Sequence, residues 1–410
     1  MRFTIRTYGC RANQYDSERI RELLTAAGAV EVDSADDADV AIFNSCTVTA
    51  AAEAELRKDV RRADQKRRGL RTIISGCAAA LPNRDEAINP LATLPSVSHI
   101  VPGADLDQLA VALGINANLV TRHTTEQSGA RALLRIQDGC NEHCTFCATT
   151  MARGDARSRT VDELIAEAAR LAGHHPEIVI TGIHIGAYGI DCGGSLGELM
   201  HALIRNVPRA RFRLTSIEAT EIDDRLLELF SEPTRLAPHL HAPLQSGSDR
   251  ILRRMGRHWY TSSSYRKRIE GLIERCDILG LSADLIAGFP GESLDDHSMT
   301  MQVVTDLPFT SLHVFPFSPR PGTAATRLGH SVPNAEIARR ARELRDLGER
   351  KSKAYAASRL GGRADVVVVE RGRGLTGDYL SVAVSDDFRR RDRFDATLEF
   401  RDGGVTAIPS

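Results

Sequence analysis

Three cysteines within one short stretch carry the clearest chemical signal in this sequence. Cys140, Cys144 and Cys147 follow one another with the spacing CxxxCxxC. Thiolates at short, fixed spacings are the usual ligands of iron–sulfur clusters. Because only three cysteines are local, a fourth iron would be left open to a substrate. The pattern therefore predicts a cluster with one accessible iron.

Two other interpretations of this loop compete with the cluster. A structural zinc site needs a closed set of four ligands. His143 could in principle be the fourth, although it lies within the loop and would crowd its neighbours. The second alternative is that the thiols are buried and chemically inert.

Three more cysteines each follow a short strand-like run near the N-terminus. Cys10, Cys46 and Cys77 are 36 and 31 residues apart. The runs span residues 3–8, 40–43 and 72–74, and helical patterns span residues 17–27 and 50–66. This alternation implies a parallel sheet, whose ligand crevice lies beyond the carboxyl ends of its strands. We expect the fold to bring the three cysteines together, although for any one of them a buried structural thiol is the simpler interpretation.

The composition limits the class of protein. The chain has 410 residues, 42% of them hydrophobic and 26% charged, with a net charge of −1. These values predict two to three globular domains and exclude a uniformly basic surface, though not a local basic patch. No apolar stretch is long enough for a membrane span, and the N-terminus lacks the apolar core of a signal peptide. We expect a cytoplasmic protein, in which eight cysteines suggest metal binding or catalysis before disulfides.

The centre of the chain alternates between strand and helix patterns. The expected strands are residues 133–137, 178–181, 212–216, 239–244, 283–287 and 312–317. The expected helices are residues 161–172, 196–206, 223–230, 249–255, 265–279 and 295–306. Six such units predict a partial (β/α)6 barrel with catalytic groups at the carboxyl ends of its strands. Cys192 lies in a Gly-rich loop and Cys276 is expected in the middle of a helix; neither is given a role.

The C-terminal part changes character. Residues 334–359 read as a helix with eight Lys and Arg against four acidic residues, and short strands separated by turns follow at 366–369, 379–384 and 396–400. That spacing suits a small β-barrel. The predicted organisation is an N-terminal parallel α/β domain (1–115), a linker (116–130), a central barrel with its trailing helix (131–359) and a C-terminal β-domain (360–410).

The cysteine loop resembles that of the radical S-adenosylmethionine superfamily. The aromatic Phe146 precedes the last cysteine, and the flanking residues 136–140 and Ala152-Arg153-Gly154 narrow the resemblance to the methylthiotransferases. The resemblance implies that the open iron binds S-adenosyl-L-methionine, whose reductive cleavage yields a 5′-deoxyadenosyl radical. The catalytic residues would be Cys140, Cys144 and Cys147. After Cys147, Ala148-Thr149-Thr150-Met151 departs from the two aliphatics, proline and aromatic that are usual in the family.

The N-terminal cysteines match the same family. Residues 9–14, 44–49 and 75–77 resemble its three motifs in order. In the family these cysteines hold an auxiliary cluster that takes part in sulfur delivery. The resemblance therefore implies two [4Fe-4S] clusters, one on Cys10, Cys46 and Cys77 and one on Cys140, Cys144 and Cys147.

Further cofactor contacts are implied at the ends of the barrel strands. By resemblance they are Phe146, Thr181, Gly182, Glu218, Gln245, Ser246, Gly288 and Phe289. The simpler alternatives are a βα turn at Gly182 and an ion pair or a solvated carboxylate at Glu218. Ser248, next to these residues, is expected to cap the following helix.

Basic residues and the C-terminal domain point to RNA. They concentrate in residues 57–71, 334–359 and the tail, where they are Arg371, Arg373, Arg389, Arg390, Arg391 and Arg393. The terminal β-domain resembles the TRAM module of RNA-modifying enzymes, although a charge run is often only a solvated helix face. Residues 9–14, 181–186, 216–218 and 312–315 resemble the family branch that modifies threonylcarbamoyladenosine.

The resemblance implies methylthiolation of carbon 2 of N6-threonylcarbamoyladenosine at position 37 of tRNA, next to the anticodon. We expect a monomer that binds the tRNA anticodon loop and an electron donor such as flavodoxin or ferredoxin. The alternatives are isopentenyladenosine in tRNA, an aspartate of a ribosomal protein, and a non-enzymatic iron–sulfur RNA-binding protein. The residues after Cys10 argue against the ribosomal-protein branch, and the cofactor-binding segments argue against a pure RNA binder.

Overall fold

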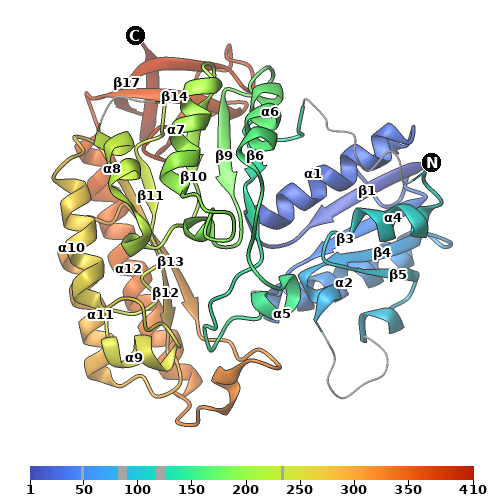
Figure 1. The fold of residues 1–410 in the computed structure, drawn as a ribbon, viewed down its shortest axis with the longest axis horizontal. Coiled ribbons are helices and arrows are strands. Elements are labelled where there is room, and N and C mark those ends of the chain that lie inside the picture. The colour runs from blue at the N-terminus through green and yellow to red at the C-terminus, as the bar shows by residue number, and fades with distance from the viewer. Residues whose placement is uncertain (48–49, 82–89, 117–125, 232–234) are drawn as a thin grey trace. The chain divides into compact units, whose positions relative to one another are not determined.

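The computed structural model describes residues 1–47, 50–81, 90–116, 126–231 and 235–410. The chain forms two compact units (Figure 1). The first contains the N-terminal part of the chain together with Asp138–Arg157 and Ser318–Thr326, and the second contains the rest. The cysteine loop at residues 140–147 therefore belongs to the same unit as the N-terminal cysteines. The predicted linker at 116–130 falls largely on residues outside the described ranges, and the predicted domain boundaries stay a prediction.

The first unit is built on a five-stranded sheet. Its strands are β1 (Arg2–Thr7), β2 (Val30–Glu31), β3 (Val40–Ser45), β4 (Arg71–Gly76) and β5 (Val97–Pro102). They lie in the order β2-β1-β3-β4-β5, and every neighbouring pair is parallel. The predicted parallel sheet is confirmed. The sequence patterns missed β2 and β5, which are largely exposed and lack a continuous apolar run.

Helices cover both faces of this sheet. Helices α1 (Arg11–Ala26) and α4 (Leu106–Leu113) pack on one face, and α2 (Ala50–Lys66) packs on the other (Figure 1). The short α3 (Cys77–Ala80) and a 3-10 turn, η1 (Pro90–Thr93), complete the unit's N-terminal part. Helix α1 begins six residues earlier than predicted. Its first turns bury the polar Asn13 and Asp16, which interrupt the apolar periodicity.

The second unit contains six parallel strands, as predicted. They are β6 (Ala132–Arg135), β9 (Glu177–Thr181), β10 (Arg211–Leu214), β11 (His239–His241), β12 (Gly280–Ala287) and β13 (Ser311–Pro316). They form two sheets, β10-β9-β6 and β11-β12-β13. A parallel bridge between Ser216 and His241 connects the two sheets. The result is the predicted partial barrel.

Helices alternate with these strands. They are α6 (Val161–Leu171), α7 (Leu196–Asn206), α8 (Asp224–Ser231), α9 (Asp249–Arg254), α10 (Ser262–Ile273) and α11 (Leu294–Asp306). The 3-10 turns η3 (Ile185–Ala187) and η4 (Ala219–Glu221) follow β9 and β10. Helix α10 ends at Ile273, so the expectation that Cys276 lies in mid-helix is wrong. The Cys276 thiol instead donates to the Phe230 carbonyl at 3.4 Å. Charged residues on both sides of Cys276 end the apolar pattern of the helix.

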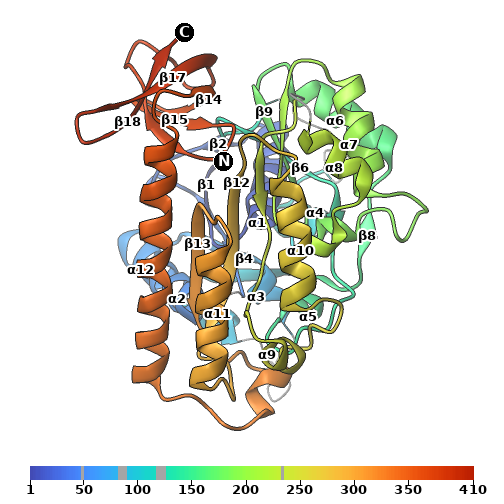
Figure 2. The ribbon, with the colours of Figure 1, turned by 90° about the vertical axis from the view of Figure 1, so that its left-hand side faces the viewer.

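A long helix and a closed barrel end the chain. Helix α12 (Asn334–Ser358) runs beside α11 and packs on β13 (Figure 2). The strands β14 (Arg363–Glu370), β15 (Arg373–Thr376), β16 (Ser381–Ala383), β17 (Arg393–Arg401) and β18 (Gly404–Pro409) then close in the order β14-β15-β16-β18-β17. The predicted small β-barrel is confirmed. Within the described residues, no helix is long and apolar enough to cross a membrane.

Buried charges fasten this terminal barrel to the strands β9 and β10. The Glu177 carboxylate is fully buried and accepts from Arg211 Nε at 2.6 Å and from Arg213 Nε at 2.9 Å. Arg213 also donates to the carbonyls of Thr376 and Gly377, at 3.0 and 2.9 Å. Although burial opposes ionisation, the two guanidinium groups hold the pKa of Glu177 well below its usual value. The barrel thus supplies acceptors that these two buried arginines need.

Replacing Glu177 with Gln should destabilise the second unit strongly. The change leaves buried guanidinium groups without their carboxylate, and breaking a buried ion pair costs about 3–5 kcal/mol. Urea unfolding should show a lower midpoint. Glu198→Gln is the matched control, because its pair with Arg225 is exposed and should leave the midpoint nearly unchanged. Equal midpoints for the two variants would contradict this role of Glu177.

Candidate functional site

The three N-terminal cysteines lie at the carboxyl ends of neighbouring strands, as the parallel sheet predicted. Cys10 caps α1 after β1, Cys46 follows β3, and Cys77 begins α3 after β4. The side chain of Asn13 marks their common centre, because its Oδ1 lies 3.7 Å from Cys10 Sγ and 3.6 Å from Cys77 Sγ. The structure therefore brings together residues that are far apart in the sequence.

A glycine makes this convergence possible. Gly9 has φ +97°, and a Cβ at this position would overlap Cys46 Sγ and lie 2.6 Å from Cys46 Cβ. Asn13 holds the same corner by donating to the carbonyls of Tyr8 and Ser45, at 3.0 and 2.7 Å. The first and second cysteine segments are thus packed against each other with no room for a side chain between them.

The three thiols differ in exposure. Cys46 and Cys77 are buried, whereas Cys10 is exposed. Burial raises the pKa of the Cys77 thiol to about 11, and the neighbouring Arg153 guanidinium opposes this rise. A thiol in this position becomes a thiolate when a metal ion takes the place of its proton.

The second cysteine set lies on a loop of the same unit. Backbone N–H groups point at two of its sulfurs, from Glu142 to Cys140 Sγ at 3.4 Å and from Thr149 to Cys147 Sγ at 3.3 Å. The loop begins at Gly139, with φ +73°, where a Cβ would collide with the Asp155 carbonyl. All three thiols are partly exposed. Partly exposed sulfurs that accept backbone hydrogen bonds suit iron–sulfur ligation.

The residues after the loop form a helix. Helix α5 (Thr149–Arg153) contains most of the segment that departs from the family pattern. The short strands β7 (Gln137–Asp138) and β8 (Arg157–Ser158) flank the loop and helix in the sequence. A third segment of the unit also reaches the loop, because the Ala325 N–H, in the 3-10 turn η5 (Ala324–Arg327), donates to the Thr145 carbonyl at 2.7 Å.

Both donor sets fit an iron–sulfur cluster. Each offers three thiols and lacks a fourth cysteine nearby in the sequence. Across the described residues, no three Cys, His, Asp or Glu side chains converge as they would on one metal ion. Cysteines that ligate a cluster bind different irons, so their sulfurs are spread more widely than the ligands of a single ion.

One buried arginine of this unit contacts both neighbourhoods. Arg153, the last residue of α5, donates from Nε to Cys77 Sγ at 3.3 Å. Its Nη2 donates to Asp16 at 2.6 Å, and its Nη1 donates to Asp138 at 3.1 Å. Burial opposes the charge of Arg153, but Asp16, Cys77 and Asp138 together raise its pKa above the usual value.

The predicted cofactor contacts after β9 are packed within the second unit. Thr181 is fully buried, and its Oγ1 has no hydrogen-bond partner among the described residues. Gly182 fits tightly, because a Cβ there would lie 2.9 Å from the Gln137 carbonyl oxygen. The Gln137 side chain in turn accepts from the N–H groups of Ile183 and His184, at 3.2 and 3.0 Å. An unpartnered hydroxyl is a free polar group for a ligand, whereas the glycine is already required by packing.

Glu218 is buried and paired rather than solvated. It forms an ion pair with Arg257, which also donates to the Tyr260 hydroxyl at 2.9 Å. Burial raises the pKa of Glu218 above its usual value, against the opposing effect of Arg257. Of the alternatives given by the sequence, the structure shows the pairing with a basic group.

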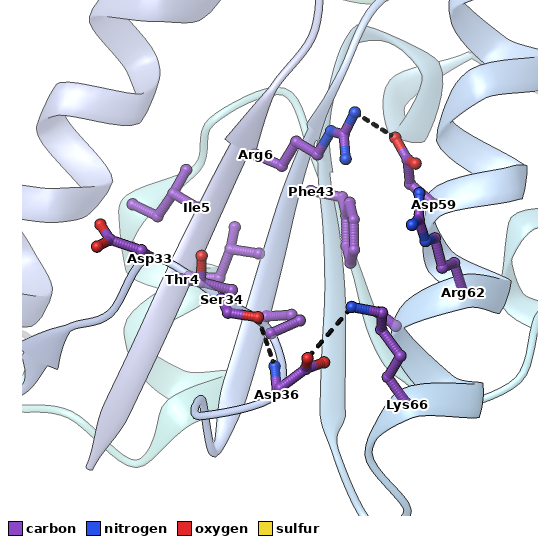
Figure 3. A pocket seen from close by; sticks show the side chains of 14 residues that line it. Thr4, Ile5, Arg6, Asp33, Ser34, Asp36, Phe43, Asp59, Arg62 and Lys66 are labelled. Atoms are coloured by element: carbon purple, nitrogen blue, oxygen red, sulfur yellow. Dashed lines mark hydrogen bonds and ion pairs between the residues drawn. The ribbon is translucent and has the colours of Figure 1, made fainter.

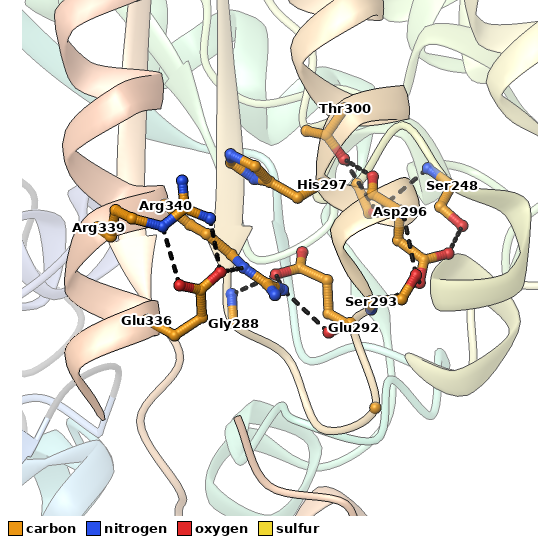
Figure 4. A network of polar contacts seen from close by, with 12 residues as sticks. Ser248, Gly288, Glu292, Ser293, Asp296, His297, Thr300, Glu336, Arg339 and Arg340 are labelled. Atoms are coloured by element: carbon orange, nitrogen blue, oxygen red, sulfur yellow. Dashed lines mark hydrogen bonds and ion pairs between the residues drawn. The ribbon is translucent and has the colours of Figure 1, made fainter. Parts of the chain in front are cut away.

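The segment after β11 contains two predicted contacts. Gln245 is buried with φ +61°, and Ser246 is fully buried beside Thr300. Ser248 accepts from the Ile251 N–H and so caps α9, as predicted, and its hydroxyl donates to Asp296 at 2.6 Å (Figure 4). These hydroxyls connect α9 to α11, and ligand binding by Gln245 and Ser246 stays a prediction.

The turn after β12 is held by a second buried ion pair. Figure 4 shows Glu292 beside Gly288 and Arg340 of α12, with contacts to both. Glu292 accepts from the Gly288 N–H at 2.8 Å and from Arg340 Nη1 at 2.7 Å. Phe289 is fully buried against Phe317, with ring centroids 5.2 Å apart. These contacts hold the turn against α12, and its contact with a cofactor stays a prediction.

A separate hollow lies between β1, β3 and α2, with a volume of about 340 Å³. Figure 3 shows Arg6 directed at Asp59 and Lys66 directed at Asp36, across distances of 3.0 and 3.2 Å. Arg62 also lines it and is exposed. The lining contains no cysteine.

Sequence reasoning missed the polar residues that surround the cysteines. Asp16 carried no motif signal, and Asn13, Asp138 and Arg153 entered only as parts of segments that resemble the family. Arg320 is buried near Cys46, with Nε and Nη2 lacking hydrogen-bond partners among the described residues. The sequence does place charged residues near the cysteine segments. Their presence alone does not tell whether such a side chain is buried against a cysteine or exposed to solvent.

Comparisons with known proteins show which family this chain belongs to. The model of the uncharacterized protein family UPF0004 matches residues 2–93, and the radical SAM superfamily model matches residues 134–304. The threonylcarbamoyladenosine tRNA methylthiotransferase MtaB of Aquifex aeolicus is 31% identical over 402 residues, covering 93% of this chain and 96% of that protein. The protein of the same name from Thermotoga maritima is 33% identical over 361 residues, covering 86% and 82%. The chain belongs to the radical S-adenosylmethionine methylthiotransferase family.

This methylthiotransferase shares its fold with a solved radical S-adenosylmethionine methyltransferase. TsrM from Kitasatospora setae matches with a TM-score of 0.57 at 13% identity, covering 79% of this chain and 76% of that one. The family assignment makes this protein an enzyme that transfers sulfur-containing groups, with an iron–sulfur cluster and S-adenosyl-L-methionine as cofactors.

Replacing Gly9 with Ala should lower the iron bound per chain. The added Cβ displaces Cys46 from the position where the three N-terminal thiols converge. Iron and acid-labile sulfide should be measured after anaerobic reconstitution. Gly28→Ala is the matched control, since Gly28 also has positive φ but open space around its Cβ position. Both variants carry the backbone cost of about 1–2 kcal/mol, so equal iron in the two would contradict the steric argument.

Proposed function

We propose that this methylthiotransferase modifies carbon 2 of N6-threonylcarbamoyladenosine at position 37 of tRNA, using two [4Fe-4S] clusters. The observation that carries the proposal is the pair of three-cysteine sets, which lie in one structural unit and are linked by Arg153. Its relatives are named as methylthiotransferases of threonylcarbamoyladenosine in tRNA, and these names support the proposed substrate.

The two sets of thiols have different proposed roles. Cys140, Cys144 and Cys147 would hold the cluster whose open iron binds S-adenosyl-L-methionine. Cys10, Cys46 and Cys77 would hold the auxiliary cluster. Bound in this way, the cofactors would supply a 5′-deoxyadenosyl radical and a methylated sulfur for transfer to carbon 2.

The chain's own residues would bind and orient the cofactor. We assign the contacts to Phe146 and to residues at the carboxyl ends of the barrel strands, where enzymes of this architecture place their sites. These are Thr181, Gly182, Glu218, Gln245, Ser246, Gly288 and Phe289. The unpartnered Thr181 hydroxyl gives the strongest support, because a buried hydroxyl without a hydrogen bond is costly unless a ligand satisfies it.

The proposed organisation keeps the boundaries expected from the sequence. Residues 1–115 would form the auxiliary-cluster domain, 131–359 the radical domain and 360–410 an RNA-binding barrel, joined by a linker at 116–130. We propose a monomeric, cytoplasmic enzyme that takes its electrons from a donor such as flavodoxin or ferredoxin.

We propose that tRNA phosphates contact α2 as well as the C-terminal barrel. Several tail arginines already face carboxylates of their own chain, such as Arg373 with Glu370 and Arg393 with Asp365, both at 2.7 Å. On and just after α2, four exposed cations have no ion-pair or hydrogen-bond partner among the described residues: Lys58, Arg61, Arg62 and Arg68. Their charge is uncompensated locally and is available to a phosphate backbone.

Replacing each cysteine set with Ala should separate the two roles. The full protein should hold about eight irons per chain, and either triple variant about half of that. The variant lacking Cys140, Cys144 and Cys147 should make no 5′-deoxyadenosine. The variant lacking Cys10, Cys46 and Cys77 should still make it but should not methylthiolate tRNA, as measured by nucleoside mass spectrometry.

The same measurement tests the substrate. Loss of the 2-methylthio group from isopentenyladenosine in a deletion strain would assign the enzyme to the other tRNA branch. A modified ribosomal-protein aspartate would assign it to the third. An intact protein that binds iron and tRNA but never cleaves S-adenosyl-L-methionine would be an RNA-binding protein instead.

Replacing Arg61, Arg62 and Arg68 with Gln should weaken tRNA binding and reduce its salt dependence. Each lost phosphate contact reduces the magnitude of the negative slope of log K against log[salt] by about 0.7–0.9. The matched variant replaces Arg371, Arg373 and Arg393, which are each paired with a carboxylate, and its slope should change less. The reverse order of effects, measured by filter binding, would assign the main phosphate contacts to the C-terminal barrel.

A further inference from the structure

We propose that Arg153 is a positioning residue that sets the reduction potential of the auxiliary cluster through its hydrogen bond to Cys77. This inference rests on the two-cluster proposal above. The Arg153 side chain would bind no iron itself, but it contacts the sulfur of Cys77, which would bind iron.

The side chain of Arg153 is 3% exposed and uses all three of its nitrogens. Nε donates to Cys77 Sγ at 3.3 Å. Nη2 donates to Asn13 Oδ1 at 2.7 Å and to Asp16 at 2.6 Å, and Nη1 donates to Asp138 at 3.1 Å. The guanidinium is therefore fixed in its plane, with one N–H directed at the sulfur.

These partners come from two distant parts of the chain. Asp138 precedes the cysteine loop at residues 140–147, and Arg153 ends the helix that follows it. Asn13, Asp16 and Cys77 belong to the N-terminal sheet and its helices. One planar group thus connects the base of the cysteine loop to a ligand of the other cysteine set. A lysine could not do this, because its single ammonium lacks the fixed fork of donors.

The hydrogen bond to sulfur separates this role from that of a plain structural ion pair. Asp16 and Asp138 would suffice to hold two segments together. A donor to a ligating sulfur, carrying positive charge in a buried place, stabilises the reduced and more negative state of a cluster. Removing Arg153 should therefore make the auxiliary cluster harder to reduce.

The test uses the full chain with Cys140, Cys144 and Cys147 replaced by Ala, so that only the auxiliary cluster remains. Within this background, Arg153→Gln, Arg153→Lys, Asp138→Asn and Arg157→Gln are reconstituted and titrated with reductant under electron paramagnetic resonance. Arg157 is exposed, and among the described residues its side chain donates only to the Arg153 carbonyl, at 3.4 Å, so it controls for the loss of a nearby charge. Asp138→Asn removes the negative charge of one partner of Arg153 but leaves the Arg153 N–H that donates to Cys77.

We expect Arg153→Gln to change the ratio of oxidised to reduced cluster at a fixed potential by tenfold or more, a shift of about 59 mV toward more negative values. Arg153→Lys should shift in the same direction by less. Arg157→Gln should match the parent, and Asp138→Asn should not become harder to reduce.

Three outcomes would overturn the inference. A potential unchanged in both Arg153 variants would leave Arg153 as a structural tether alone, and Arg153→Lys decides this if the glutamine variant loads too little iron. An equal negative shift in Asp138→Asn would assign the effect to loop position rather than to the sulfur contact. A background protein without iron would overturn the two-cluster proposal itself, and this inference with it.

Discussion

A buried guanidinium group needs acceptors on several sides, and this requirement organises both units of the protein. In the first unit, Arg153 finds its acceptors on α1, at the start of α3 and before the cysteine loop. In the second, Arg213 finds them on β9 and in the terminal barrel. Because an unpaired buried charge is so costly, each of these side chains forces distant segments of the chain to meet. Each arginine thus holds several loops and strand ends together through its hydrogen bonds.

The second constraint is the direction of parallel strands. All strands of a parallel sheet end at the same edge, so residues that follow them converge whatever their separation in sequence. Cys10, Cys46 and Cys77 follow three adjacent strands and meet for this reason. The convergence is tight enough that Gly9 has no room for a side chain. A cluster ligand set can therefore be assembled from single cysteines, without the short spacing that the second set uses.

The predicted cofactor-binding segments of the barrel also have structural duties. Ser248 and Asp296 connect α9 to α11, and Glu292 with Arg340 holds the turn after β12 against α12. Such bracing is what a site on loops needs, because contacts to a ligand depend on backbone held within a narrow range. The family resemblance implies ligand binding by residues in these segments. Neighbouring side chains hold the backbone of the segments in place. The unpartnered Thr181 hydroxyl is the exception, since nothing in the described protein satisfies it.

The sequence by itself determined the pattern of strands and helices, because apolar periodicity records which face of each element is buried. It placed all six barrel strands, the closed C-terminal barrel and the order of both cysteine sets. It failed where buried groups are polar, because Asn13 and Asp16 in the first turns of α1 interrupt the apolar periodicity. It also extended α10 past Ile273 to include Cys276. Only the tertiary structure decided that the cysteine loop at residues 140–147 belongs with the N-terminal sheet, and that Arg153 reaches Cys77. These contacts join residues 76 positions apart, and no local pattern distinguishes an arginine that is buried against a sulfur from one that is solvated.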